Sequence, residues 1–139
     1  MTLPDAQFYG AERGGWLEVK SKSDIMCFEK WDNRLEHGID KEKFQAYCIV
    51  QLRTEMPVYL LIVEMSTGKL LMADLNTLRS SGRPRSGQWP DGKPSVNWDR
   101  GVFAEIGMFV VPNGDLTKLK ITWNQNTLNS FLSQLELGV

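Results

Sequence analysis

Two carboxylates and one ammonium group stand near the start of this 139-residue chain at a spacing that suits metal chemistry. Glu18 and Lys20 lie two residues apart in a short run of alternating apolar and charged residues, and twelve residues separate Asp5 from Glu18. Such alternation predicts a strand, on which residues two apart share a face. We therefore expect Glu18 and Lys20 to point the same way, with Leu17 and Val19 on an opposite face that can be buried.

A hairpin would bring Asp5 to this strand. Gly14-Gly15 marks a tight turn, and residues 7–9 would form a strand that returns antiparallel. Two carboxylates at one end of a hairpin suit a hard cation such as Mg²⁺, which proteins often bind through one or two carboxylates. The competing interpretation is that Glu18 and Lys20 form an exposed ion pair worth ~0–1 kcal/mol. The presence of Asp5 favours the metal site.

The pattern Pro4-Asp5, twelve residues, then Glu18-Val19-Lys20 resembles that of the PD-(D/E)xK nuclease superfamily. The elements expected to follow have a similar order: a helix over 40–55, a strand over 57–64, a turn at 66–68 and a strand over 69–75. The resemblance covers roughly residues 4 to 78. It implies a restriction-endonuclease-like α/β fold, in which a central mixed β-sheet is flanked by helices, and a metal-dependent endonuclease with DNA as the expected substrate.

The resemblance also implies a role for each residue of the motif. Asp5 and Glu18 would hold Mg²⁺ or Mn²⁺, with the carbonyl of Val19 as a third oxygen ligand. The bound ion lowers the pKa of a water molecule and neutralises charge that develops on the phosphate. Lys20 would stabilise the same charge.

The helix expected over 40–55 begins at Asp40, a good N-cap residue. Its apolar stripe, which we expect to pack on the sheet, consists of Phe44, Tyr47, Cys48 and Leu52. In several members of the superfamily a Gln or Tyr on this helix supports the catalytic strand. The resemblance therefore gives Gln45 and Tyr47 a supporting role here.

The superfamily normally has a helix and a strand before the Pro-Asp pair, whereas three residues precede Pro4. Three accounts stay open: a closing helix expected over 127–137 takes the vacant helix position, the chain is a fragment or one half of a larger assembly, or Asp5 matches by coincidence and the resemblance fails. Before that helix, residues 102–111 and 119–123 predict strands that are joined by a turn at 112–115. Residues 21–39 are expected to connect the motif strand to the first helix through short elements.

Residues 79–101 predict a long basic loop rich in Gly and Pro within a single domain of residues 1–139. Five basic residues stand against two acidic ones, and two tryptophans, Trp89 and Trp98, interleave with them. This composition suits contacts with nucleic acid, and the residues expected to make them are Lys22, Arg79, Arg83, Arg85, Trp89 and Lys93. Replacing Arg83 and Arg85 should then weaken binding with little change in stability. The alternative is a surface hairpin whose tryptophans cover the core.

Composition sets the class of the protein without selecting a function. The chain is long enough for one domain that buries about two-thirds of its unfolded surface. The net charge of −1 means that phosphate binding must come from a local patch. No stretch approaches the ~20 apolar residues of a membrane span, and the N-terminus lacks the pattern of a signal peptide. We therefore expect a cytoplasmic protein without a membrane partner.

The cysteines and the histidine predict no metal motif. Cys27 and Cys48 are far apart, and we expect free buried thiols rather than a disulfide. His37, the only histidine, cannot assemble a zinc site alone. It is expected to be a loop residue before the helix, with a role as general base as the alternative.

Two other functions stay open from the sequence. One is a catalytically silent relative of the nucleases that binds nucleic acid or a partner protein, and the other is an unrelated α+β module. Magnesium-dependent cleavage would distinguish the nuclease from both of these. Salt-sensitive binding of nucleic acid would distinguish the silent relative from the unrelated α+β module. A double-strand cut needs two active sites, which a homodimer would supply.

Overall fold

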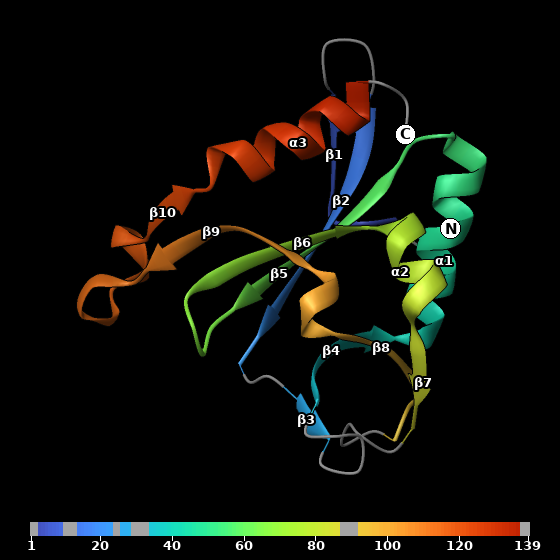
Figure 1. The fold of residues 1–139 in the computed structure, drawn as a ribbon, viewed down its shortest axis with the longest axis horizontal. Coiled ribbons are helices and arrows are strands. Elements are labelled where there is room, and N and C mark those ends of the chain that lie inside the picture. The colour runs from blue at the N-terminus through green and yellow to red at the C-terminus, as the bar shows by residue number, and fades with distance from the viewer. Residues whose placement is uncertain (1–2, 10–13, 24–25, 29–33, 87–91, 137–139) are drawn as a thin grey trace.

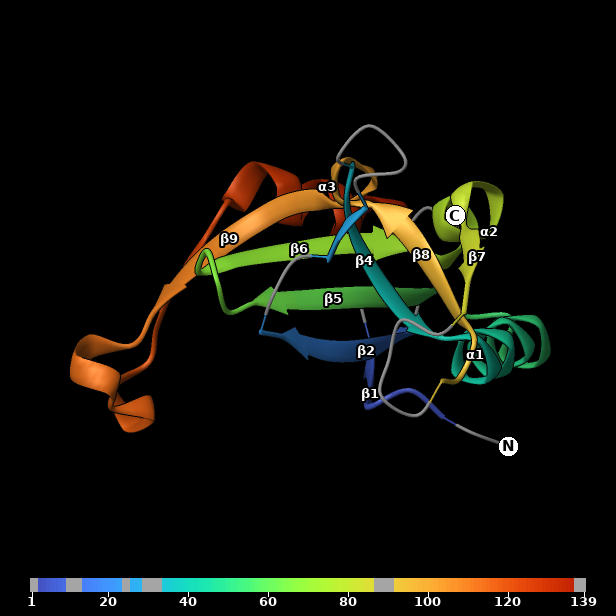
Figure 2. The same cartoon turned by 90° about the horizontal axis from the view of Figure 1, so that it is seen from below.

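The structure, a computed structural model, describes residues 3–9, 14–23, 26–28, 34–86 and 92–136. In these ranges the chain forms an α/β fold with two β-sheets and three α-helices (Figure 1). The smaller sheet and helix α3 (Gln125–Glu136) lie on opposite faces of the larger sheet, as Figures 1 and 2 show together.

The larger sheet is mixed and strongly curled (Figure 2). Its strand order is β1-β2-β5-β6-β9-β10, and only the neighbours β2 and β5 run parallel. The strands are β1 (Ala6–Tyr9), β2 (Gly14–Lys22), β5 (Val58–Glu64), β6 (Lys69–Asp74), β9 (Ala104–Val110) and β10 (Lys120–Trp123).

The smaller sheet is antiparallel and has the order β3-β4-β8-β7. Its strands are β3 (Met26–Phe28), β4 (Arg34–Asp40), β8 (Ser95–Asp99) and β7 (Arg83–Arg85). Helices α1 (Lys41–Thr54) and α2 (Leu75–Ser81) complete the fold with the short 3-10 turns η2 (Arg100–Val102), η3 (Pro112–Gly114) and η4 (Leu116–Lys118). The described residues contain no helix that is both long and apolar enough to cross a membrane.

Two apolar clusters fill the two faces of the larger sheet. The first joins β2 and β5 to α1, α2 and the smaller sheet, with Trp16, Ile62, Val50, Leu78 and Trp98 among its members. The second lies on the other face of the larger sheet and is built from Tyr59, Leu61, Leu70, Met72, Ile106 and Phe109. Because strand residues alternate between faces, β2 directs Trp16 and Glu18 toward the first cluster.

The strands and the helix predicted around the motif are confirmed, since they correspond to β1, β2, α1, β5 and β6. The predicted turn at Gly14-Gly15 is wrong. Both glycines belong to β2, where they pair with Tyr9 and Phe8 of β1. Residues 10–13, which join the two strands, lie outside the described residues. A Gly-Gly pair also fits an extended backbone, so it does not fix a turn by itself.

The predicted loop over 79–101 instead contains two strands of the smaller sheet, β7 and β8. The connecting stretch over 21–39 contains β3 and most of β4, which are the short elements expected there. Asp74 caps α2 by accepting a hydrogen bond from the Thr77 N–H at 2.9 Å, and this helix extends to Ser81. Pro84 then lies in β7, the last strand of the smaller sheet among the described residues. Proline is tolerated on such edge strands because they need fewer backbone donors. The Gly and Pro content therefore marked short strands here as well as loops.

Candidate active site

The β1–β2 hairpin brings Asp5 to Glu18, as the sequence predicted. Ala6 pairs with Leu17, so Asp5 lies beside Glu18 just before β1 begins. The backbone N–H of Asp5 donates to Oε1 of Glu18 at 3.1 Å, and the N–H of Val19 donates to Oδ2 of Asp5 at 2.8 Å. The backbone of each segment therefore donates to the acidic side chain of the other, which holds Asp5 beside Glu18.

The Glu18 carboxylate is buried on the face of β2 that packs against α1. The residue is only 3% exposed, and its Oε2 accepts a hydrogen bond from the hydroxyl of Tyr47. Lys20 Nζ lies 3.4 Å from the same oxygen and is itself about a quarter exposed. The competing interpretation of an exposed ion pair does not fit this geometry, since one partner is buried. On the opposite face Leu17 is half-buried, whereas Val19 is exposed rather than buried.

Helix α1 holds Tyr47 over the strand. The helix begins where Asp40 accepts hydrogen bonds from the N–H groups of Glu42 and Lys43, as expected for an N-cap. Tyr47 and Val50 are its buried residues, whereas Gln45 is exposed. The structure thus brings one of the two predicted supporting residues to Glu18. Leu52 of the predicted stripe is exposed, so the buried face of α1 is rotated from the one expected.

The electrostatics of the group follow from these contacts. Interaction with the Glu18 side chain, followed by the hydrogen bond from the Val19 N–H, lowers the pKa of Asp5. Burial, together with the hydrogen bond to Glu18 and the charge of that carboxylate, raises the pKa of Tyr47. The Tyr47 hydroxyl therefore stays protonated at neutral pH and donates to Glu18 rather than repelling it.

The donor set fits a magnesium site that is completed by water and substrate. A residue in a strand points its N–H and its carbonyl to the same edge, so the Val19 carbonyl faces the edge at which Asp5 lies. Asp5, Glu18 and this carbonyl would supply three oxygen ligands, and Mg²⁺ typically keeps several waters. Within the described ranges no three His, Cys, Asp or Glu side chains gather as a metal-binding group.

A second polar cluster adjoins the site four residues further along β2. Lys22 pairs in register with Glu64 of β5, and the Glu64 carboxylate is fully buried. Arg100 donates to both Glu64 oxygens, at 2.8 and 2.7 Å, and Thr67 donates to Oε1. Nε2 of His37 lies 2.6 Å from Oε2 of Glu64. The cluster ties β5 of the larger sheet to β4 of the smaller one.

Sequence reasoning missed this cluster, and the prediction that His37 lies in a loop is wrong. His37 is a buried residue of β4, and burial lowers its pKa despite the hydrogen bond with Glu64. Lys22 Nζ donates to the Gly38 carbonyl at 2.6 Å, and burial, followed by the charge of Lys20, lowers the pKa of Lys22 to about 8. The available signal was Glu64 itself, an acidic residue at the end of an otherwise apolar strand.

The Glu64 cluster predicts a loss of stability in acid. Burial alone would raise the pKa of Glu64, but the hydrogen bonds from Arg100, Thr67 and His37 outweigh it and lower the pKa to about 2. A depressed folded-state pKa stabilises the fold above the unfolded value of about 4.5. The free energy of unfolding should therefore fall as pH drops from about 4.5 to about 2, by on the order of 3 kcal/mol.

Urea titrations at a series of pH values measure this loss in the parent and in Glu64→Gln. The variant should be less stable at neutral pH and should show a shallower fall below pH 4.5. Equal slopes in the two proteins over this range would contradict the assignment of the acid transition to Glu64.

Two arginines expected to contact nucleic acid are engaged with acidic residues in the smaller sheet. Arg83 makes two hydrogen bonds to Asp99, at 2.8 and 3.0 Å, and lies 3.3 Å from Glu36. Arg85 lies 2.9 Å from the same oxygen of Glu36, whose side chain is fully buried. The structure therefore gives these side chains a role in the fold, and their predicted contacts with phosphate stay a prediction.

The other residues of the predicted nucleic-acid surface are spread over the molecule. Arg79 lies in the last turn of α2 and Lys93 precedes β8, both exposed. Trp89 lies outside the described residues. Trp98 is fully buried and donates from Nε1 to the Leu78 carbonyl at 2.7 Å. For Trp98 the alternative interpretation, in which the tryptophans cover the core, is therefore the better description.

Comparisons with protein-family models, with curated proteins and with solved structures gave no match to this chain.

Proposed function

We propose that this protein is a metal-dependent endonuclease with a restriction-endonuclease-like arrangement of its sheet, and that it hydrolyses phosphodiester bonds of DNA. One observation carries the proposal: the buried carboxylate of Glu18 accepts a hydrogen bond from the backbone N–H of a second acidic residue, Asp5, and its other oxygen lies 3.4 Å from Nζ of the partly exposed Lys20. Three donors offset the cost of burying the Glu18 carboxylate, and a buried carboxylate held beside a cation and a second acidic residue is typical of functional sites.

Each residue has a defined task in the proposed reaction. Asp5, Glu18 and the Val19 carbonyl would hold Mg²⁺ or Mn²⁺, which lowers the pKa of bound water and neutralises charge on the phosphate. The Tyr47 hydroxyl fixes the Glu18 carboxylate, and the Val19 N–H fixes that of Asp5. Lys20 is exposed enough to reach a phosphate oxygen and stabilise its developing charge.

Incubation with supercoiled plasmid in Mg²⁺, and in parallel in EDTA, tests the proposal. Nicked circles should form in Mg²⁺ or Mn²⁺ and not in EDTA, because the carboxylates repel the phosphate in the absence of the metal. Intact plasmid in both buffers contradicts a nuclease. If the protein then binds DNA with strong dependence on salt, it is a silent member of the same class instead.

A further inference from the structure

Strand β10 forms an edge of the larger sheet that is exposed on both faces. In the described part of the chain the strand order ends at β10, which pairs only with β9. All four residues of β10 are exposed, and Ile121 and Trp123 are each 44% exposed. Figure 1 shows β9 and β10 in an arm that projects from the body of the molecule and ends in the turns between the two strands. The outer backbone edge of β10 is therefore open to another strand.

The arm is also unusually apolar for a surface. Of the large apolar residues that are exposed in the described part of the chain, half fall within residues 108–123, namely Met108, Val110, Leu116, Leu119, Ile121 and Trp123. Protein edge strands are usually protected from association by charges, proline or bulges. Lys120 is the single charged residue of β10, and the strand has no proline. An edge of this kind is expected to pair with another chain.

The sequence of β10 is complementary to itself. In an antiparallel pair, residues directly opposite each other share a face, so a two-fold axis must pass between a residue and its own copy. With the axis at Ile121, this residue faces its own copy and Leu119 faces Trp123. Lys120 faces Thr122 on the other side of the sheet. Apolar residues thus meet apolar residues, and the only charge meets a hydroxyl.

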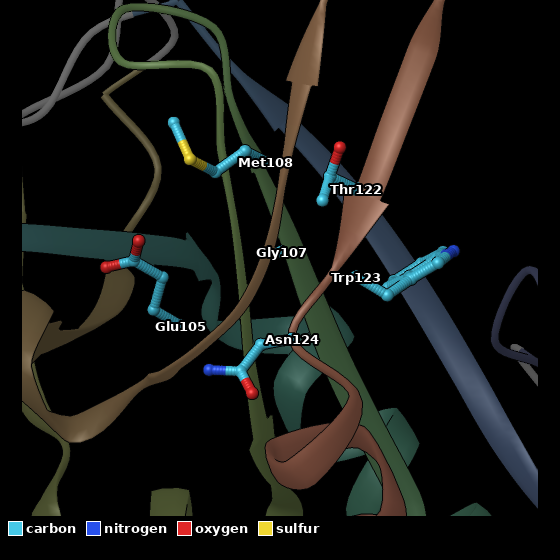
Figure 3. Close-up of a pocket in the computed structure, with 6 residues that line it drawn as sticks. All are labelled: Glu105, Gly107, Met108, Thr122, Trp123 and Asn124. Carbon is cyan, nitrogen blue, oxygen red and sulfur yellow. The ribbon is translucent and has the colours of Figure 1, made fainter.

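A pocket beside β10 adds a complementary charge. It has a volume of about 250 Å³ and is lined by Glu105, Gly107, Met108, Thr122, Trp123 and Asn124 (Figure 3). In the two-fold register, Lys120 of the second copy lies opposite Thr122, at the wall of this pocket. The half-exposed carboxylate of Glu105, which lies 3.4 Å from Nζ of Lys69 in its own chain, lines the same pocket and could interact there with a second cation. The two-fold symmetry would place Lys120 of one copy beside the pocket of the other twice.

We propose that β10 is the interface of a symmetric dimer, in which the β10 strands of two copies of this chain pair antiparallel around Ile121. The two larger sheets then become one continuous sheet. The dimer is inferred from the geometry of the arm alone. Only its consequence, two nuclease sites in one particle, rests on the proposed function.

Light scattering after size exclusion, over a range of protein concentrations and without DNA, tests the dimer. The parent should have the mass of two chains. Ile121→Lys should be a monomer, because two ammonium groups would meet at the axis. Leu116→Lys makes the same kind of change on the same arm but away from the β10 edge, and it should remain a dimer.

Mixing two charged variants tests the register. Ile121→Lys and Ile121→Glu should each be monomeric alone and should form a dimer when mixed, because position 121 faces itself. A mixture that stays monomeric, a parent that is monomeric at every concentration, or an Ile121→Lys variant that stays dimeric overturns the proposal.

A monomeric parent whose DNA binding is weakened by Trp123→Ala would make the arm a nucleic-acid contact instead. Because no cleavage is measured, these outcomes do not depend on nuclease activity.

Discussion

Lys20→Ala should slow metal-dependent DNA cleavage by on the order of 10²-fold or more, because it removes a positive charge that is needed most in the transition state. Lys20 Nζ lies 3.4 Å from the buried Glu18 carboxylate and keeps about a quarter of its side chain exposed. The rate should be measured at saturating DNA, so that weaker binding does not lower it. A melting curve verifies that the variant remains folded without the ammonium group beside Glu18.

Lys69→Ala is a matched control for this substitution. Lys69 also lies 3.4 Å from a glutamate oxygen and has a similar exposed fraction, but its partner Glu105 is half-exposed. The two variants thus remove the same charge from similar ion pairs at different places on the sheet. Lys69→Ala should cleave at the rate of the parent. Equal rates in the two variants would contradict a catalytic role for Lys20.

Arg85→Ala should lower the free energy of unfolding by about 3 kcal/mol, the lower end of the cost of breaking a buried ion pair. Glu36 is fully buried and Arg85 nearly so, and their charged atoms lie 2.9 Å apart. The lower end applies because Arg83 still approaches the same Glu36 oxygen. Adding Arg83→Ala should destabilise the fold further, since Glu36 would then lose both cations. Urea denaturation measures each step.

Arg79→Ala combined with Lys93→Ala provides the comparison for the arginine variants. This pair also removes two positive charges, but from exposed positions outside the smaller sheet, where the loss of an ion pair costs little, so stability should change by no more than about 1 kcal/mol. If Arg79 and Lys93 contact phosphates, the slope of the logarithm of the DNA-binding constant against the logarithm of the salt concentration should become less steep by roughly one to two units. If the variant that lacks both Arg83 and Arg85 is as stable as the parent, the ion pairs of the smaller sheet do not stabilise the fold, contrary to this prediction.

Local patterns predicted the part of the fold that carries the candidate site. The alternation around Glu18, the N-cap Asp40 and the apolar run of β5 each act over a few residues, and each corresponds to an element of the structure. Short-range signals of this kind need no knowledge of distant partners. The approach of Asp5 to Glu18 followed from the antiparallel hairpin alone.

The smaller sheet could not be predicted in this way, because its strands are short and their partners are remote. His37 of β4 pairs with Trp98 of β8, and Gly38 with Asn97, across a long stretch of sequence. One face of these strands is polar but buried, so their composition is similar to that of a loop. Arg83 looked available for phosphate because the acidic residues it meets come from two other strands.

The dependence of the cleavage rate on Mg²⁺ concentration, compared between the parent and Asp5→Asn, tests the central claim most directly. Asp5→Asn removes one charge with little change of shape, and Asp5 is exposed, so the fold should be preserved. The parent should cleave faster as Mg²⁺ rises and then saturate, whereas Asp5→Asn should cleave on the order of 10²-fold more slowly. Cleavage by Asp5→Asn at the parent rate, or by the parent in EDTA, would contradict a metal held between Asp5 and Glu18.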